Sequence, residues 1–189
     1  GTASGLARYD GYRFKVFYSS DNDPTSLPDS YIEKIVEDGE GRLWIRTGEN
    51  GYIIYNWNTE NFVRDVRSWM WNIGIDGTPR HVFVDSQKNM WFAVDGKGCY
   101  RYSPEEKKAD VLPFGEKGIP EGIIIDMIEC KDGVVLVYDN GHVFCIDREE
   151  VKVKWELTEI MEEMGNRTDI FFLYVDKDED LWIYGAPGV

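Results

Sequence analysis

The sequence contains few of the residues that catalysis, metal binding or membrane crossing requires. Its 189 residues include 2 histidines and 3 cysteines, and 21 basic residues stand against 35 acidic ones. The formal net charge of −14 disfavours a phosphate backbone or an anionic membrane surface, so we expect neither nucleic acid binding nor direct membrane contact. No run approaches the ~18 apolar residues that cross a bilayer, and residues 1–9 do not resemble a signal peptide.

The scarce reactive side chains do not form a recognisable site. Cys99, Cys130 and Cys145 show no CxxC spacing and each lies in an apolar run, so we expect buried free thiols, which do not report the compartment. His81 and His142 have no His or Cys partner at ligand spacing and are interpreted as ordinary strand residues. We therefore expect no cofactor and no catalytic centre.

A repeat of about 46 residues runs through the chain, whose 42% hydrophobic and 14% aromatic content is that of a globular protein. In three segments an Asp stands six residues before a Trp, and a degenerate fourth segment has Cys and Leu at these positions. The anchor pairs are Asp38 with Trp44, Asp85 with Trp91, Cys130 with Leu136, and Asp176 with Trp182. Successive anchors lie 47, 45 and 46 residues apart.

Each repeat predicts four short antiparallel strands. An apolar strand ends at the Asp, whose side chain can bond backbone amides of the following turn, and a second strand begins at the Trp. A third strand follows a turn that contains Gly, such as Gly51 or Gly141, and a less regular fourth strand completes the unit. Strands recurring in this way indicate a β-propeller, whose blades bury their faces only against neighbouring blades.

The phase of the repeat places both ends of the chain inside a blade. We predict an all-β fold, a single β-propeller segment over residues 1–189 with four-stranded antiparallel blades. Complete blades are expected at 31–66, 78–113 and 122–155, and half-blades at 1–17 and 170–189. The half-blades could pair with each other, or with those of a second copy, or belong to a longer propeller.

One segment departs from the strand pattern. Its apolar residues recur at helical spacing between glutamates, and Gly165 can end a helix. The sequence therefore predicts a short amphipathic helix near 157–164, packed on the propeller.

The repeat resembles the two-component regulator propeller repeat, with the rough pattern I-x-x-I-x-x-D-x-x-G-x-L-W-I-G-T followed by G-L-x-R-Y-D. Residues 31–47, with Gly51 and Tyr55 after them, carry this pattern, and residues 5–12 fit its end. Arg46 stands where the pattern has Gly, Tyr52 stands where it has Leu, and the third complete blade lacks both the Asp and the Trp.

This resemblance implies the extracytoplasmic sensor region of a hybrid two-component system of Bacteroides-type gut bacteria. In such proteins propellers precede a β-sandwich domain, a membrane helix and a histidine kinase. The resemblance thus implies a periplasmic or extracytoplasmic segment at the inner membrane, with any kinase activity outside these residues. The implied signal is a carbohydrate, commonly an oligosaccharide.

Aromatic residues outside the phase of the repeat are the candidates for ligand recognition. Residues 64–72 join two blades without strand alternation, and such a linker can lie on an end face, where propellers usually bind ligands. A flat apolar ring also matches the face of a pyranose. We predict four ligand-binding residues, Trp57, Arg67, Trp69 and Trp71. The alternative is that these rings seal the join between blades.

Three aspartates, Asp176, Asp178 and Asp180, space oxygen atoms as some calcium loops do. They also form the hairpin turn of their repeat and lack the Gly and distal Glu of an EF-hand. We interpret them as a solvated turn and predict no metal site.

The leading functional hypothesis is a non-catalytic ligand-sensing segment of a two-component sensor. The alternative is a structural or protein-interaction propeller without its own small-molecule ligand, including self-association through the cut blade edges. A propeller hydrolase or lyase is disfavoured, because no acid–base pair stands out from the repeat.

Overall fold

The computed structural model describes residues 5–48, 51–115, 118–158 and 170–186. The chain divides into two compact units, residues 1–79 (unit 1) and 80–189 (unit 2), and each is described by itself. The described residues form three four-stranded antiparallel sheets, two two-stranded sheets and one short helix. This confirms the predicted all-β class of three complete blades and two half-blades. None of the described helical residues form a helix long and apolar enough to cross a membrane.

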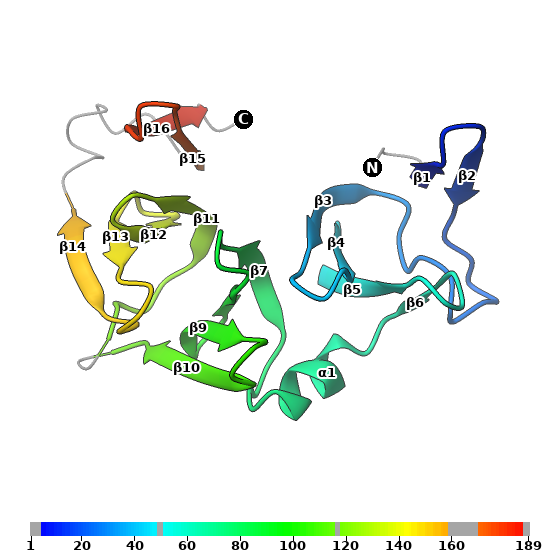
Figure 1. The fold of residues 1–189 in the computed structure, drawn as a ribbon, viewed down its shortest axis with the longest axis horizontal. Helices are drawn as coiled ribbons and strands as arrows, with labels where there is room; N and C mark the ends of the chain where they lie inside the picture. Colours follow the sequence, from blue (N-terminus) through cyan, green and yellow to red (C-terminus); the bar gives the residue numbers. More distant parts are fainter. Residues whose placement is uncertain (1–4, 49–50, 116–117, 159–169, 187–189) are drawn as a thin grey trace. The chain divides into compact units, whose positions relative to one another are not determined.

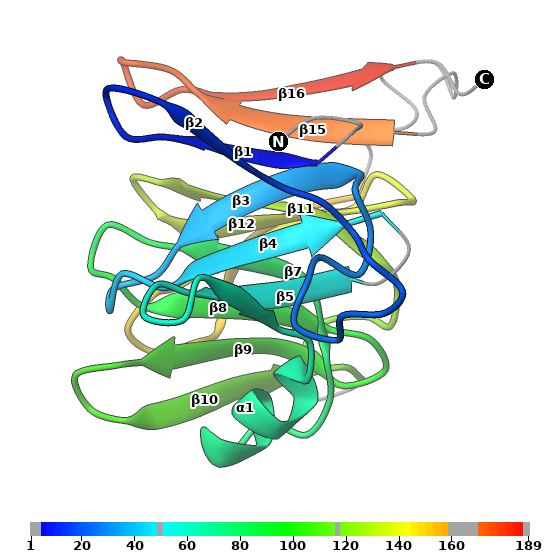
Figure 2. The ribbon, with the colours of Figure 1, turned by 90° about the vertical axis from the view of Figure 1, so that its right-hand side faces the viewer.

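Unit 1 holds the N-terminal half-blade, the first complete blade and the helix (Figures 1 and 2). The half-blade pairs β1 (Leu6–Tyr9) with β2 (Phe14–Phe17). The first complete blade consists of β3 (Ile32–Glu37), β4 (Leu43–Thr47), β5 (Gly51–Asn56) and β6 (Asn61–Val63), hydrogen-bonded in that order. The helix α1 (Val66–Asn72) follows β6 and packs against β5.

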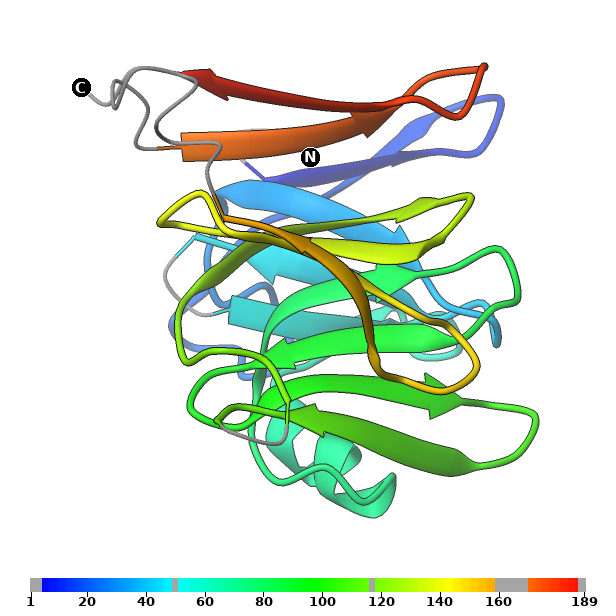
Figure 3. The same ribbon diagram turned by 90° about the vertical axis from the view of Figure 1, so that its left-hand side faces the viewer.

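Unit 2 holds two complete blades and the C-terminal half-blade, whose hairpin is orange to red in Figure 3. The second complete blade consists of β7 (Pro79–Val84), which starts at the boundary, β8 (Met90–Val94), β9 (Gly98–Ser103) and β10 (Lys108–Pro113). The third consists of β11 (Ile124–Cys130), β12 (Gly133–Tyr138), β13 (Val143–Ile146) and β14 (Val153–Leu157). The half-blade pairs β15 (Ile170–Val175) with β16 (Leu181–Ala186).

The repeated Asp builds the turn between the first and second strands and also holds the Trp. Asp38 Oδ1 accepts hydrogen bonds from the amides of Glu40 and Arg42, both at 2.9 Å, and its Oδ2 accepts one from Trp44 Nε1 at 3.0 Å. The same indole bond joins Trp91 to Asp85 at 2.9 Å and Trp182 to Asp176 at 2.7 Å. The Asp thus satisfies turn amides and an indole N–H together.

The residue two positions before the second strand has a positive φ in all three of these turns, at Gly41, Lys88 and Glu179. Each turn is a three-residue loop, since the amide of this residue donates to the carbonyl of the Asp. A type I turn followed by a left-handed residue is the common build of a three-residue hairpin. The repeat therefore fixes turn geometry even where Gly is replaced.

The degenerate repeat has a shorter turn than the other three. Because of this, the predicted alignment of Leu136 with the tryptophans is wrong. Cys130 pairs with Gly133, so the loop between β11 and β12 contains two residues instead of three. Trp44 and Trp91 each pair with the residue ten positions later, and Val135, not Leu136, does so in the third complete blade. Losing one residue in the turn moves each following side chain to the opposite face of the strand.

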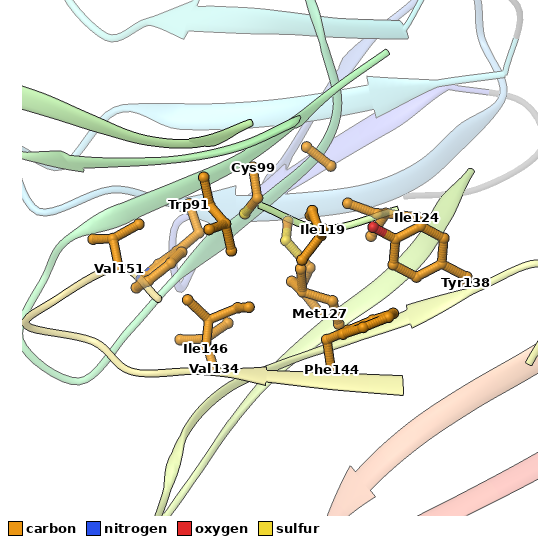
Figure 4. Packing of buried hydrophobic residues seen from close by; sticks show 13 residues of the cluster. Trp91, Cys99, Ile119, Ile124, Met127, Val134, Tyr138, Phe144, Ile146 and Val151 are labelled. Carbon is orange, nitrogen blue, oxygen red and sulfur yellow. The ribbon is translucent and has the colours of Figure 1, made fainter. Parts of the chain in front are cut away.

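The third complete blade packs through both of its faces, which we call N-side and C-side after the neighbour they contact. The N-side face of the third complete blade contributes Leu136 and Phe144 to a core shared with Trp91 and Cys99 of the second blade (Figure 4). Its C-side face contributes Val135, Cys145 and their neighbours to a core with Leu173 of the half-blade. In unit 1, the core between half-blade and first blade includes Leu6, Ile45 and Tyr55.

The helix of this structure is not the one that the sequence predicts. Helix α1 spans Val66–Asn72, whereas the pattern indicated a helix near 157–164. Leu157 is the last residue of β14, and residues 159–164 lie outside the described part of the chain.

Candidate functional site

Helix α1 presents part of the predicted ligand-binding set to solvent. Asp65 caps the helix, since its carboxylate accepts bonds from the Ser68 hydroxyl at 2.6 Å and the Ser68 amide at 3.0 Å. These two bonds, led by the hydroxyl, lower the pKa of Asp65. Val66 and Met70 are buried and anchor the opposite side of the helix. The cap and this anchor position the exposed residues between them.

Arg67 and Trp71 are one helical turn apart and lie on the same exposed side of α1. The Trp71 side chain is 67% exposed. Arg67 forms an ion pair with Asp76 at 3.4 Å, with both side chains largely in solvent. A depression of 420 Å³ is lined by Asp65, Arg67, Ser68, Trp71 and Asn72, which we call the α1 surface.

A second, smaller cavity of 160 Å³ adjoins the α1 surface and shares Asp65 and Arg67 with it. Its remaining lining residues come from the start of β5, the start of the linker and the start of β7, namely Gly51, Tyr52, Arg64, Val66, Thr78 and Pro79. The two cavities together offer a cation, a carboxylate, an amide, a hydroxyl and an indole face. This combination suits a polyhydroxylated ligand, because hydroxyl groups bind polar side chains while a sugar face stacks on an indole.

The other two predicted residues have structural contacts instead. The Trp69 ring meets Trp44 edge to face with 4.7 Å between centroids, and the Arg42 guanidinium lies 4.9 Å from its centre. Trp57 donates from Nε1 to the carbonyl of Gly41 at 2.8 Å and packs against Tyr55. Neither lines the α1 surface, so the structure brings Arg67 and Trp71 together and places Trp57 and Trp69 at joins within unit 1.

Sequence reasoning missed Asp65, Ser68 and Asn72, which complete the α1 surface. The available signal was Asp65, since Asp is one of the residues preferred at the N-cap of a helix. Asn72 could not be found from the sequence, because its role depends on where α1 ends.

Unit 2 has a separate polar cavity of 340 Å³, lined by Gln87, Asn89, Arg101, Ser103, Glu105, Glu106 and Glu149. Arg101 is 8% exposed and pairs with Asp110 at 2.8 Å. Its Nη1 also donates to the carbonyl of Arg148 in the turn after β13. The arginine therefore joins the second and third complete blades, and Arg8 occupies the same repeat position with bonds to Tyr55 at 3.0 Å and Glu60 at 2.7 Å.

The aspartates of the last turn are used within the turn. Asp176 accepts from the amides of Asp178 and Asp180 and from the indole of Trp182, which together lower its pKa, the indole bond most. Among the residues that the structure describes, no group of three His, Cys, Asp or Glu side chains could hold a metal ion.

The three cysteines are free and buried. Burial raises the pKa of the Cys99 and Cys145 thiols to about 12, so both stay protonated at neutral pH and are poor nucleophiles. Cys130 and Cys145 contribute to one core from β11 and β13, with β12 between them. A hydrogen bond between these two thiols contributes to the raised pKa of Cys145, after burial.

The blades, with the Asp–Trp hydrogen bond repeated in three of them, define a β-propeller segment built from one repeated unit. Residues 26–49 match the family model described as the two-component regulator propeller. This confirms the resemblance read from the first complete blade. No curated protein sequence matches the chain.

Solved structures extend the likeness to nearly the whole chain. The extracellular domain of a B. thetaiotaomicron protein described as a hybrid two-component system shares 21% identity with a TM-score of 0.60, over 89% of this chain and 21% of that one. A second such domain from the same organism shares 20% identity with a TM-score of 0.60, over 96% of this chain and 25% of that one. At this identity the likeness establishes the propeller fold, and the chain spans a quarter or less of these domains.

Proposed function

We propose that the chain is a ligand-sensing, non-catalytic β-propeller segment of a two-component signal-transduction sensor on the extracytoplasmic side of the membrane. The observation that carries this proposal is the regulator propeller repeat at residues 26–49. It is supported by the fold shared with extracellular domains of hybrid two-component systems. Catalysis is not part of the proposal, because the Cys99 and Cys145 thiols stay protonated and the repeated aspartates serve their turns.

The proposed ligand is a carbohydrate fragment that binds at the α1 surface. Trp71 offers an exposed indole face, and Arg67, Asp65, Ser68 and Asn72 surround it with donors and acceptors. Stacking provides affinity for the sugar face, while the polar groups select the pattern of hydroxyls. Trp57 and Trp69 are not part of the proposed site, since their rings pack elsewhere within unit 1.

Calorimetry against a broad panel of oligosaccharides tests this proposal. We expect at least one fragment to bind, and Trp71→Ala to weaken that binding about fivefold, since stacking contributes roughly 1 kcal/mol. Arg67→Ala should weaken binding as well. Trp57→Phe is the matched control and should leave the affinity unchanged, because it retains a ring outside the α1 surface. Absence of binding to every fragment by the folded chain would contradict the carbohydrate proposal, and turnover of a glycan would contradict the non-catalytic one.

The alternative function is an interaction propeller without its own small-molecule ligand. The exposed aromatic residues of the two half-blades favour it, since Phe14 is 68% and Trp182 is 59% exposed. The oligosaccharide panel distinguishes the two functions, because an interaction propeller binds no sugar and its association with a partner does not depend on Trp71.

A further inference from the structure

The described side chains that line the smaller cavity beside α1 carry more positive than negative charge, unlike the chain as a whole. Among these residues Arg64 and Arg67 are cationic and Asp65 is anionic, around a volume of 160 Å³. The whole chain has a formal net charge of −14, so the local balance departs from the average. A cavity with this balance favours a ligand that carries an anionic group.

The Asp65 carboxylate of this cavity is engaged by the helix cap. Its Oδ1 accepts a hydrogen bond from the Ser68 amide at 3.0 Å, and its Oδ2 accepts one from the Ser68 hydroxyl at 2.6 Å. These bonds, the hydroxyl bond most, lower the pKa of Asp65, so the cap stays ionised at neutral pH. An incoming anion therefore meets a carboxylate that already has partners, beside two guanidinium groups.

Arg64 is held in place by uncharged acceptors. Its Nε donates to the carbonyl of Ser26, and its Nη2 donates to the carbonyls of Asp23 and Leu27 and to the Ser26 hydroxyl, all at 3.1 Å. None of these four acceptors is a side-chain carboxylate. The bonds therefore fix the Arg64 guanidinium at the cavity without neutralising its charge.

Arg67 has a weak partner that a ligand can replace. Its Nη2 donates to Asp76 Oδ1 at 3.4 Å, which is long for a charge-assisted hydrogen bond, and the two side chains are 71% and 47% exposed. An exposed ion pair of this kind contributes little, because water screens both charges. An oxyanion that accepts two hydrogen bonds from the planar guanidinium binds more strongly than this single contact.

Arg67 is also close to the residue proposed to stack on the sugar. Trp71 is four residues further along α1, so the two side chains are neighbours on one side of the helix, with roughly 5–6 Å between their Cβ atoms. Both line the depression of 420 Å³, in which Trp71 is 67% exposed. A carboxylate or sulfate ester is attached at the edge of a pyranose ring. A sugar that lies flat on the indole therefore presents such a group sideways, toward Arg67.

We propose that the carbohydrate bound at the α1 surface is an acidic sugar, whose oxyanion binds Arg67 while its ring stacks on Trp71. This inference rests on the proposed function and narrows its ligand class. The oxyanion is the carboxylate of a uronic acid or a sulfate ester, since either accepts two hydrogen bonds from a guanidinium. Arg64 adds a second positive charge from the adjoining cavity. The net charge of the chain repels such a ligand only at long range, because physiological salt screens charges beyond about 8 Å.

Calorimetry with matched acidic and neutral fragments tests this inference. The probes are uronic acid oligosaccharides of several linkages, their uncharged methyl esters, and further oligosaccharides with and without sulfate esters. We expect an acidic fragment to bind about tenfold more tightly than its neutral counterpart, because the hydrogen bonds to Arg67 are charge-assisted. Added salt should reduce this preference. The uronate and sulfate arms identify the oxyanion, since each acid is compared with its own neutral form.

Substitutions at Arg67 and Asp76 distinguish ligand binding from a structural role. Arg67→Gln should remove the preference for the acidic fragment and leave the affinity for the neutral fragment nearly unchanged. Asp76→Asn removes the competing carboxylate and should strengthen binding of the acidic fragment about two- to fivefold. If Arg67 acted only by holding Asp76, both substitutions would change this affinity in the same direction.

Arg13→Gln is the matched control for the loss of one positive charge. The Arg13 side chain is 87% exposed and does not line either cavity, so its replacement should leave the preference unchanged. Equal or tighter binding of every neutral counterpart, or a preference that persists in Arg67→Gln, contradicts the acidic ligand while the carbohydrate proposal stands. Absence of binding to every fragment, acidic or neutral, contradicts the carbohydrate proposal itself.

Discussion

At the scale of single residues, one motif occurs in three environments. The bond from the Trp indole to the Asp six residues earlier is present in all three repeats. Trp44 and Trp91 are fully buried, whereas Trp182 is 59% exposed. A lost hydrogen bond costs most where water cannot replace it. The same substitution should therefore have different effects in different repeats.

Asp85→Ala should lower the free energy of unfolding by about 3 kcal/mol, because it leaves the buried indole of Trp91 and two turn amides without an acceptor. Asp176→Ala is the matched control and should cause a smaller loss, since its turn is open to water. Urea denaturation measures both. Equal losses would show that burial does not determine how much this hydrogen bond contributes to the free energy of unfolding.

The sequence predicts the turn role of the Asp but not its bond to the indole. Six residues separate the two side chains, and only the three-residue loop brings them together. The sequence also does not show which tryptophans are buried in contacts and which are exposed. Trp69 and Trp71 are neighbours in the chain, yet the first packs on Trp44 and the second is exposed, because they lie on different sides of α1.

At the scale of the element, the hairpin from β11 to β12 shows how turn length sets the faces of a strand. Its two-residue loop ends at Gly133, whose φ is +157°. A Cβ at this position would lie 2.1 Å from the carbonyl oxygen of Ile146. The close approach of β12 and β13 therefore depends on this glycine.

Gly133→Ala should destabilise the protein by at least about 2 kcal/mol, since the backbone of β13 has to move. Gly96→Ala is the control, with a positive φ and open space around the added Cβ, and should cost about 1 kcal/mol. Thermal and urea unfolding measure the order of the two. A Gly96→Ala loss equal to or larger than the Gly133→Ala loss would contradict the role assigned to the close approach.

The sequence predicts that a blade exists near residues 122–155 but not its strand alignment. Counting positions aligns Leu136 with the tryptophans, whereas deletion of one turn residue gives Val135 that place. The helix α1 was missed for a related reason. Its Asp65 cap becomes recognisable only when the end of β6 is known.

At the scale of the whole molecule, an acidic chain is stabilised by hydrogen bonds to its carboxylates. These bonds are the largest cause of the lowered pKa of the acidic groups concerned. The groups are Asp10, Asp23, Glu60, Asp65, Asp110, Asp147 and Asp176. A carboxyl with a lower pKa in the folded state stabilises the fold when it is ionised.

The free energy of unfolding should therefore be retained above the ordinary carboxyl pKa of about 4 and fall as the pH drops through the lowered values. Urea denaturation at pH 6, 4 and 3 measures this dependence. Asp65→Asn combined with Asp176→Asn should reduce the loss between pH 4 and 3. A stability that does not change over this range would contradict the assignment.

The period of the repeat was sufficient to predict the number of complete and half-blades, because every blade repeats the same strand and turn chemistry. The α1 surface was predictable only in part. Arg67 and Trp71 were named because they lie in a linker outside the phase of the repeat, while the polar residues around them depend on the cap and the end of a seven-residue helix.

The exposed Trp182 provides an optical signal that the buried Trp44 and Trp91 do not. An indole in water emits at longer wavelength than one in an apolar core, so Trp182 contributes the red edge of the fluorescence when its face is open. Subtracting the spectrum of Trp182→Phe isolates this contribution. A quencher in solution would reduce this isolated emission more than the emission of the buried tryptophans.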